Sequence, residues 1–312
     1  MKNCLPARAN LEIRKCLVKV LKILNYLKTN QEYSKPRVKN MNSNYENNLP
    51  IKRSLKLIYI LSFIVAALMT VSSLAGILYQ SEIYPSDELL GTFMSNDVVN
   101  LLIGLPIILG SMFLTMRKKL IGLLLWPGAL FFVLYNYLIY VLAMPFNLAF
   151  LLDLVLVTLS LYTIVALVAC IDGESIKKKR SGKVHEKISG AILAGMGVLF
   201  LFQVVGVMIV ALGNQTLIAG TELATHVSDF LLSPALVIGG ILLWHRKDFG
   251  YVSGLGLLFQ LSMLFIGLIM FLIIQAVLMI TPFALVDVVV ISVMGLIGFV
   301  PFALFARGLS RN

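Results

Sequence analysis

Eight apolar runs divide the chain between residues 54 and 306, and they constrain its fold more than any other feature. The runs cover residues 54–80, 97–116, 119–143, 147–171, 188–212, 222–245, 250–279 and 283–306. A helix needs about 20 apolar residues to cross the hydrocarbon core of a bilayer, so each run predicts one transmembrane helix. We therefore expect an all-α integral membrane protein, with an eight-helix transmembrane bundle over residues 51–312 in the lipid bilayer of the cell membrane.

The balance of apolar and charged residues excludes a single soluble domain. Of the 312 residues, 59% are hydrophobic and 13% are charged, whereas soluble domains carry about 25% charged residues. In a soluble protein, the net charge of +11 would suggest nucleic-acid binding. Here the basic residues form short clusters between apolar runs, so they indicate topology, and no nucleic-acid partner is expected.

The positions of the basic clusters orient the bundle. They lie at 52–56, 117–119, 177–187, 246–247 and 307–311. If eight helices alternate in direction, every cluster falls on one side of the membrane and the other side receives no Lys or Arg. Cytoplasmic loops are the ones enriched in Lys and Arg, so both termini are predicted to be cytoplasmic. Anionic lipid headgroups are the expected partners of these loops.

The two halves of the chain share a spacing that indicates an internal repeat. Pro106 and Pro234 lie 128 residues apart inside corresponding runs, as do the basic turns that follow them and then Gly122 and Gly250. An even number of spans per half predicts two parallel four-helix repeats, over 54–171 and 188–306. Chance is the alternative, because proline, glycine and basic loops are common in membrane proteins.

Residues 1–50 form a polar, basic N-terminal tail without the pattern of a cleavable signal peptide. Apolar residues recur at helical spacing from Leu11 to Leu27, with lysines on another face. This pattern predicts an amphipathic helix over residues 9–29, lying on the anionic inner leaflet. A disordered basic tail is the alternative, and Met41 leaves open that residues 1–40 result from a misassigned start.

Three short segments resemble motifs of a known group of proteins. They are Asn96-Asp97-x-Val99, Tyr135-Asn136-Tyr137-x-x-Tyr140 and Phe146-Asn147-x-x-Phe150-Leu151. The first lies in the second apolar run, and the others lie in and between the third and fourth. They resemble segments of uncharacterised prokaryotic multi-pass membrane proteins. The resemblance implies a prokaryotic membrane protein and no activity.

Ionisable residues inside the apolar runs are the first candidates for function, because a charge at the bilayer centre costs about 2.5–3.5 kcal/mol. Asp153, Asp229 and Asp287 qualify, and all three lie in the outer halves of their predicted helices. The helix dipole explains an aspartate in a first turn. We interpret Asp97 in that way, and the same is an alternative for Asp287. Asp153 and Asp229 lie six or seven residues into their runs, where capping explains them poorly.

Residues 222–245 carry the sharpest polar pattern. Glu222, His226, Asp229 and Ser233 are spaced four, three and four apart, so they lie on one face of a helix. Pro234 follows and frees a backbone carbonyl. His226 and Asp229 could together bind a cation or pass a proton. A structural hydrogen bond between packed helices is the alternative.

Aromatic and amide side chains add to the same outer layer. They are Tyr135, Asn136, Tyr137 and Tyr140 within 119–143, Asn100 within 97–116, and Asn147 at the start of 147–171. An interfacial aromatic belt is the alternative for the tyrosines. An amide facing lipid is costly, so Asn136 is predicted to line a pocket with Tyr140.

The outer layer contains carboxylates, amides, phenols and one imidazole, but no Lys or Arg. Buried aspartates without a cationic partner must be protonated or must hold a cation. We therefore expect a proton, a cation or a small solute as the ligand. Phosphate-binding and hydrolase motifs are absent. His226 with carboxylates is a sparse ligand set for zinc, so no metal or cofactor is expected.

Three hypotheses for function follow. The first is a proton- or cation-linked transporter or sensor of a small solute, with a pocket in the outer half centred on Asp153, His226 and Asp229. The second is an intramembrane enzyme that acts on a lipid or isoprenoid through the His226–Asp229 pair. The third is a non-catalytic subunit of a membrane complex, whose aspartates join helices.

Overall fold

The computed structural model describes residues 49–278, 280 and 285–310. The amphipathic helix expected over 9–29 and the uncertain start within 1–40 lie outside these residues. The described part of the chain is helical, and an isolated antiparallel bridge joins Ile51 to Ile171.

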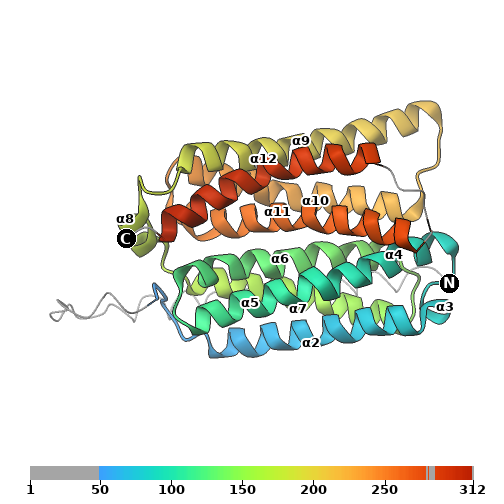
Figure 1. The fold of residues 1–312 in the computed structure, drawn as a ribbon, viewed down its shortest axis with the longest axis horizontal. Coiled ribbons are helices and arrows are strands. Elements are labelled where there is room, and N and C mark those ends of the chain that lie inside the picture. The colour runs from blue at the N-terminus through green and yellow to red at the C-terminus, as the bar shows by residue number, and fades with distance from the viewer. Residues whose placement is uncertain (1–48, 279, 281–284, 311–312) are drawn as a thin grey trace, which may run out of the picture. The chain divides into compact units, whose positions relative to one another are not determined.

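The helices follow one another with short connections (Figure 1). In chain order they are α2 (Lys56–Leu78), α3 (Gln80–Ile83), α4 (Asp87–Val99), η2 (Asn100–Gly104), α5 (Leu105–Met116), α6 (Leu120–Ala143), α7 (Leu148–Cys170), α8 (Gly173–Arg180), α9 (Glu186–Asn214), α10 (Gly220–Trp244), α11 (Asp248–Val277) and α12 (Leu285–Ser310). The element η2 is a single turn of π-helix.

Eight helical segments in the described residues are long and apolar enough to cross a membrane, and they have 23 to 30 residues each. The segment of α4, η2 and α5 counts as one, from Asp87 to Met116. The predicted all-helical class and the predicted number of long apolar helices are therefore confirmed.

The second long helix begins ten residues earlier than its apolar run suggests. The Ser86 Oγ accepts a hydrogen bond from the Leu89 amide at 3.3 Å, and Asp87 and Glu88 follow in the first turn. A serine N-cap followed by acidic residues is a favourable helix start. The interpretation of Asp97 as a first-turn residue is therefore wrong, because Asp97 lies well inside the helix.

The helix α6 occupies the interior of the bundle. In its most apolar stretch 72% of the residues are buried, against 17–44% in the other seven long helices. It contacts α5 and α7 as well as α10 and α11 (Figure 1). Polar side chains of α6 therefore face other helices and not the surroundings.

The basic segments gather at one end of the bundle. The Lys52 amide donates to the Cys170 carbonyl at 2.7 Å, and the Lys177 Nζ lies 3.0 Å from the Asp248 Oδ1. These contacts join the segment before α2 to the end of α7, and α8 to the start of α11. The α5–α6 and α10–α11 turns and the end of α12 lie at this same end (Figure 1).

The turns that join α5 to α6 and α10 to α11 have the same local structure. Lys118 (φ 58°) and Arg246 (φ 53°) are 128 residues apart, and both adopt the left-handed backbone conformation. Each donates its amide to the carbonyl three residues earlier, at 2.9 Å in both turns.

A second pair with the same spacing lies where α6 crosses α11. A Cβ atom added to Gly128 would meet the carbonyl oxygen of Gly256, and one added to Gly256 would lie 3.0 Å from the Gly128 nitrogen. The absence of side chains at these two positions therefore lets the backbones of α6 and α11 touch.

Candidate functional site

The most deeply buried carboxylate of the bundle is Asp97 on α4, whose side chain is inaccessible to solvent. The Tyr140 Oη on α6 donates to its Oδ1 at 2.8 Å, and the Tyr84 Oη donates to its Oδ2. Burial and the adjacent Asp97 raise the pKa of Tyr84 above its ordinary range, so this phenol keeps the proton that it donates.

A second buried carboxylate, Asp153 on α7, bonds to α2. It is 1% exposed, and the Ser72 Oγ donates to its Oδ1 at 2.9 Å. Asp153 and Asp97 are close enough to interact electrostatically.

Hydroxyl groups lie near both carboxylates. The Tyr137 Oη lies 3.1 Å from the Ser73 Oγ, and it donates to the Met69 carbonyl at 3.2 Å. Ser73 also lies near Asp97. We call Asp97, Ser73, Tyr137, Ser72 and Asp153 the carboxylate–hydroxyl chain. A hydroxyl both donates and accepts, so a proton passes along this chain only if the Tyr137 hydroxyl turns away from the Met69 carbonyl to which it donates.

The helix α2 makes room for this arrangement at Gly76. A Cβ atom added there would collide with the carboxylate of Asp97 and with the hydroxyl of Tyr84. Ser73 follows Ser72 directly, and Gly76 lies three residues after Ser73 and four after Ser72. The helix α2 therefore presents two hydroxyls and a gap on one side.

No Lys or Arg residue is classed as buried in the described part of the chain. Its buried polar residues include the carboxylates of Asp97, Asp153 and Glu186, but no Lys or Arg. A desolvated carboxylate without a cation is stabilised by protonation or by donated hydrogen bonds. Asp97 and Asp153 are therefore buried carboxylates of the kind that the sequence analysis expected, without a Lys or Arg partner among the described residues.

The remaining two members of the expected centre lie elsewhere. Asp229 on α10 accepts a hydrogen bond from the Tyr135 Oη on α6 at 2.9 Å. The His226 Nε2 lies 3.5 Å from the Glu222 Oε1, and both of its ring nitrogens are buried without a hydrogen-bond partner. Asp153 bonds to α2 and Asp229 to α6, so the structure does not bring Asp153 together with His226 and Asp229.

The other predicted site residues have separate environments. The Asn136 Nδ2 donates to the Phe132 carbonyl of its own helix at 3.0 Å, and Asn147 caps α7 by accepting from the Phe150 amide at 2.9 Å. Asn100 is fully buried in η2, with neither amide atom hydrogen-bonded. Asp287 is exposed in the first turn of α12. Of the seven residues predicted to bind a ligand or cation, Tyr140 and Asp153 bond to members of the arrangement around Asp97. The other five, which do not, are His226, Asp229, Asn136, Asp287 and Asn100.

Several residues of this arrangement were not proposed as site residues from the sequence: Ser72, Ser73, Gly76, Tyr84 and Asp97. Tyr137 was named in the outer polar layer, with an interfacial aromatic belt as the alternative. A signal was present for some of them. The pair Ser72-Ser73 followed by Gly76 interrupts an otherwise apolar run, and Ser86-Asp87-Glu88 is a helix start that moves Asp97 inward.

The described residues contain no group of three or more His, Cys, Asp or Glu side chains arranged to hold a metal ion. Comparisons with protein-family models, with curated proteins and with solved structures found no match for this chain. The resemblance to prokaryotic multi-pass membrane proteins therefore stays a prediction.

Proposed function

We propose that this chain is a multi-pass protein of the cell membrane that transports or senses a small solute in a proton-linked manner. The carboxylate–hydroxyl chain carries the proton. The observation that carries the proposal is the burial of Asp97 and Asp153 among hydroxyl groups, with no buried Lys or Arg among the residues that the structure describes. Intramembrane ionisable residues are expensive to retain and typically mark ion or proton pathways, which supports a role in proton coupling.

The membrane placement is supported by the eight long apolar helices and by the gathering of basic segments at one end. With that end in the cytoplasm, the positive-inside rule is satisfied at every turn. The basic turns then face anionic headgroups of the inner leaflet, and Asp97 and Asp153 lie in the outer half of the bundle.

We also propose that the two halves are parallel repeats related by an axis along the membrane normal. The matched turns at Lys118 and Arg246 support this relation. So does the contact of Gly128 with Gly256, because residues at equivalent positions meet only next to such an axis.

The π-turn η2 adds one residue to the first half. Residues of the first half after this turn therefore match residues 128 positions later in the second half, and residues up to its start match residues 129 positions later. With this spacing of 129, Asp97 corresponds to His226 and Asn100 corresponds to Asp229. Each half then carries a polar pair three residues apart on its second long helix. Single-turn π-bulges are frequent at functional sites, which supports a role for the first of these pairs.

The proposal is tested with the purified full-length chain in proteoliposomes that contain a pH-sensitive dye. Candidate solutes are added outside, and the solute-dependent change in internal pH is recorded. We expect Asp97→Asn and Asp153→Asn to abolish this change. Asp287→Asn is the matched control and is expected to keep it, because Asp287 is exposed. Unchanged proton movement in the first two variants would instead favour a non-catalytic subunit whose aspartates join helices.

A further inference from the structure

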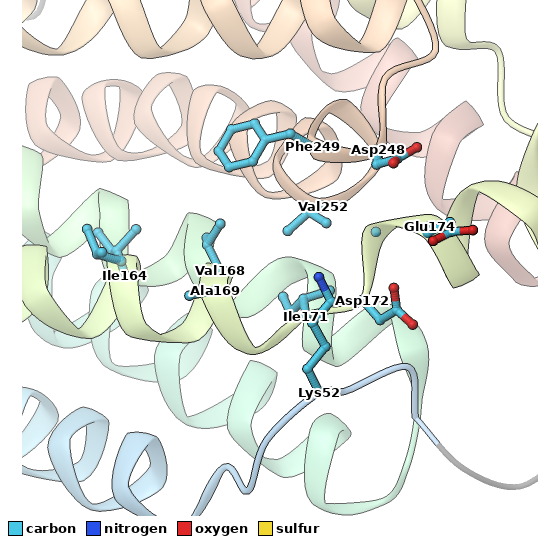
Figure 2. Close-up of a pocket in the computed structure, with 12 residues that line it drawn as sticks. Lys52, Ile164, Val168, Ala169, Ile171, Asp172, Glu174, Asp248, Phe249 and Val252 are labelled. Carbon is cyan, nitrogen blue, oxygen red and sulfur yellow. The ribbon is translucent and has the colours of Figure 1, made fainter. Parts of the chain in front are cut away.

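A cavity of about 650 Å³ lies where α7 ends, α8 begins and α11 begins. One wall is apolar and is formed by Ile164, Val165 and Val168 of α7 and by Phe249 and Val252 of α11. Figure 2 shows Ile164 and Val168 of this wall on one side and the carboxylates of Asp172, Glu174 and Asp248 on the other. The cavity is therefore amphipathic along its length.

The charged end of the cavity is electrically balanced. Three carboxylates (Asp172, Glu174 and Asp248) and the ammonium group of Lys52 line it. Two lysines of α8 form ion pairs with two of these carboxylates. The Lys177 Nζ lies 3.0 Å from Asp248, and the Lys178 Nζ lies 2.8 Å from Glu174. Three positive and three negative groups suit a ligand that carries one charge of each sign.

The carboxylate of Asp172 is held in a fixed position. The Ser175 Oγ donates to its Oδ2 at 2.6 Å, and the Ser175 amide donates to its Oδ1 at 3.4 Å. These hydrogen bonds lower the pKa of Asp172, so it remains an anion. Lys52 acts on Asp172 in the same direction, which places an opposite charge beside it at this end.

The apolar wall continues onto surfaces that the bundle leaves uncovered. Val165 is 60% exposed and Phe249 is 49% exposed. The charged end lies at the end of the bundle where the basic segments gather. If the chain spans a membrane as proposed above, the cavity reaches from the level of the headgroups to the level of the acyl chains.

We propose that this cavity binds one phospholipid with a primary-ammonium headgroup, of the phosphatidylethanolamine type. The ammonium group lies among Asp172, Glu174 and Asp248, the phosphate lies at Lys52, and an acyl chain follows Val165 and Phe249. A primary ammonium donates N–H bonds to carboxylates. A quaternary ammonium is recognised by aromatic cages, and among the described residues Phe249 alone contributes an aromatic ring to the lining.

The test uses the full-length chain in detergent with equal amounts of phosphatidylethanolamine, phosphatidylcholine and phosphatidylglycerol, and native mass spectrometry counts the retained lipids. We expect one phosphatidylethanolamine per chain, retained about tenfold over the other two lipids. Val165→Trp fills the cavity from an exposed position and should remove this preference, as should Lys52→Gln. The matched controls Val71→Trp and Lys56→Gln are exposed on α2 away from the cavity and should keep it.

Equal retention of the three lipids, or an unchanged preference in Val165→Trp, would overturn the proposal. Water-soluble glycerophosphoethanolamine is added as a competitor, and displacement of the lipid at comparable concentration would identify the free headgroup as the ligand instead. The proposal rests on the membrane placement, which fails separately if the chain does not float with vesicles. If the lipid proposal alone is wrong, the chain still floats with vesicles, and proteoliposomes with Val165→Trp still show normal proton movement.

Discussion

Tyr140 on α6 donates a hydrogen bond of 2.8 Å to Asp97 on α4, and both side chains are buried. This bond joins the most buried helix of the bundle to a carboxylate that has no salt bridge to a Lys or Arg within residues 49–278, 280 and 285–310. The predictions below follow from this relationship and from the backbone contacts that make it possible.

Tyr140→Phe removes the hydroxyl donor and leaves the Asp97 Oδ1 buried without this partner. A buried polar atom that loses its partner costs about 1–3 kcal/mol, so we expect the variant to unfold at lower temperature. Thermal unfolding in detergent, followed by circular dichroism, measures the effect. Tyr162→Phe is the control, because that side chain is 67% exposed, and equal melting of the two variants would contradict the prediction.

Gly76→Ala introduces a methyl group where the Asp97 carboxylate and the Tyr84 hydroxyl lie. We expect destabilisation of about 1–3 kcal/mol from overpacking and a loss of solute-dependent proton movement. The matched substitution Gly110→Ala on α5 meets no atom within 4 Å. It should be neutral or stabilise by up to about 1 kcal/mol, because alanine favours helices. If Gly76→Ala behaves like Gly110→Ala, the packing described around Asp97 is wrong.

The crossing of α6 and α11 predicts an order of effects. Gly128→Ala directs its Cβ at a backbone oxygen of Gly256, whereas Gly256→Ala brings its Cβ to 3.0 Å from Gly128. Backbone atoms in packed helices cannot move aside easily, so we expect Gly128→Ala to cost about 1–3 kcal/mol or more and Gly256→Ala to cost less. Gly195→Ala, which meets nothing within 4 Å, should have little effect on the melting temperature.

Asp153→Asn and Asp153→Ala separate the charge of this residue from its hydrogen bond with Ser72. If Asp153 is protonated, asparagine resembles it and stability changes by less than about 1 kcal/mol, whereas alanine leaves Ser72 without its acceptor and costs about 1–3 kcal/mol. The C=O stretching band of a protonated carboxyl group, measured by infrared spectroscopy, should weaken in both variants. A band of full intensity in Asp153→Asn would show that Asp153 does not hold that proton.

Particular residues show why local patterns predicted some positions and missed others. Asp153 was predicted as a buried carboxylate because its depth in an apolar run left capping as a poor explanation. Asp97 was missed because the ten residues before it are too polar to extend the apolar run, although Ser86 begins the helix there. The start of a helix depends on its cap as well as on its hydropathy.

The sequence alone determined that the chain forms eight long apolar helices, because helix length and hydropathy are local properties of each run. It also determined that the basic residues lie in every second connection between these helices. Only the tertiary structure decided which polar residues meet. Asp153 and Asp229 have similar depth and similar neighbours in sequence, yet Asp153 bonds to Ser72 of α2 and Asp229 to Tyr135 of α6. The partner of a side chain depends on which helices pack on each face, and that packing follows from close contacts such as Gly128 with Gly256 and from the space at Gly76.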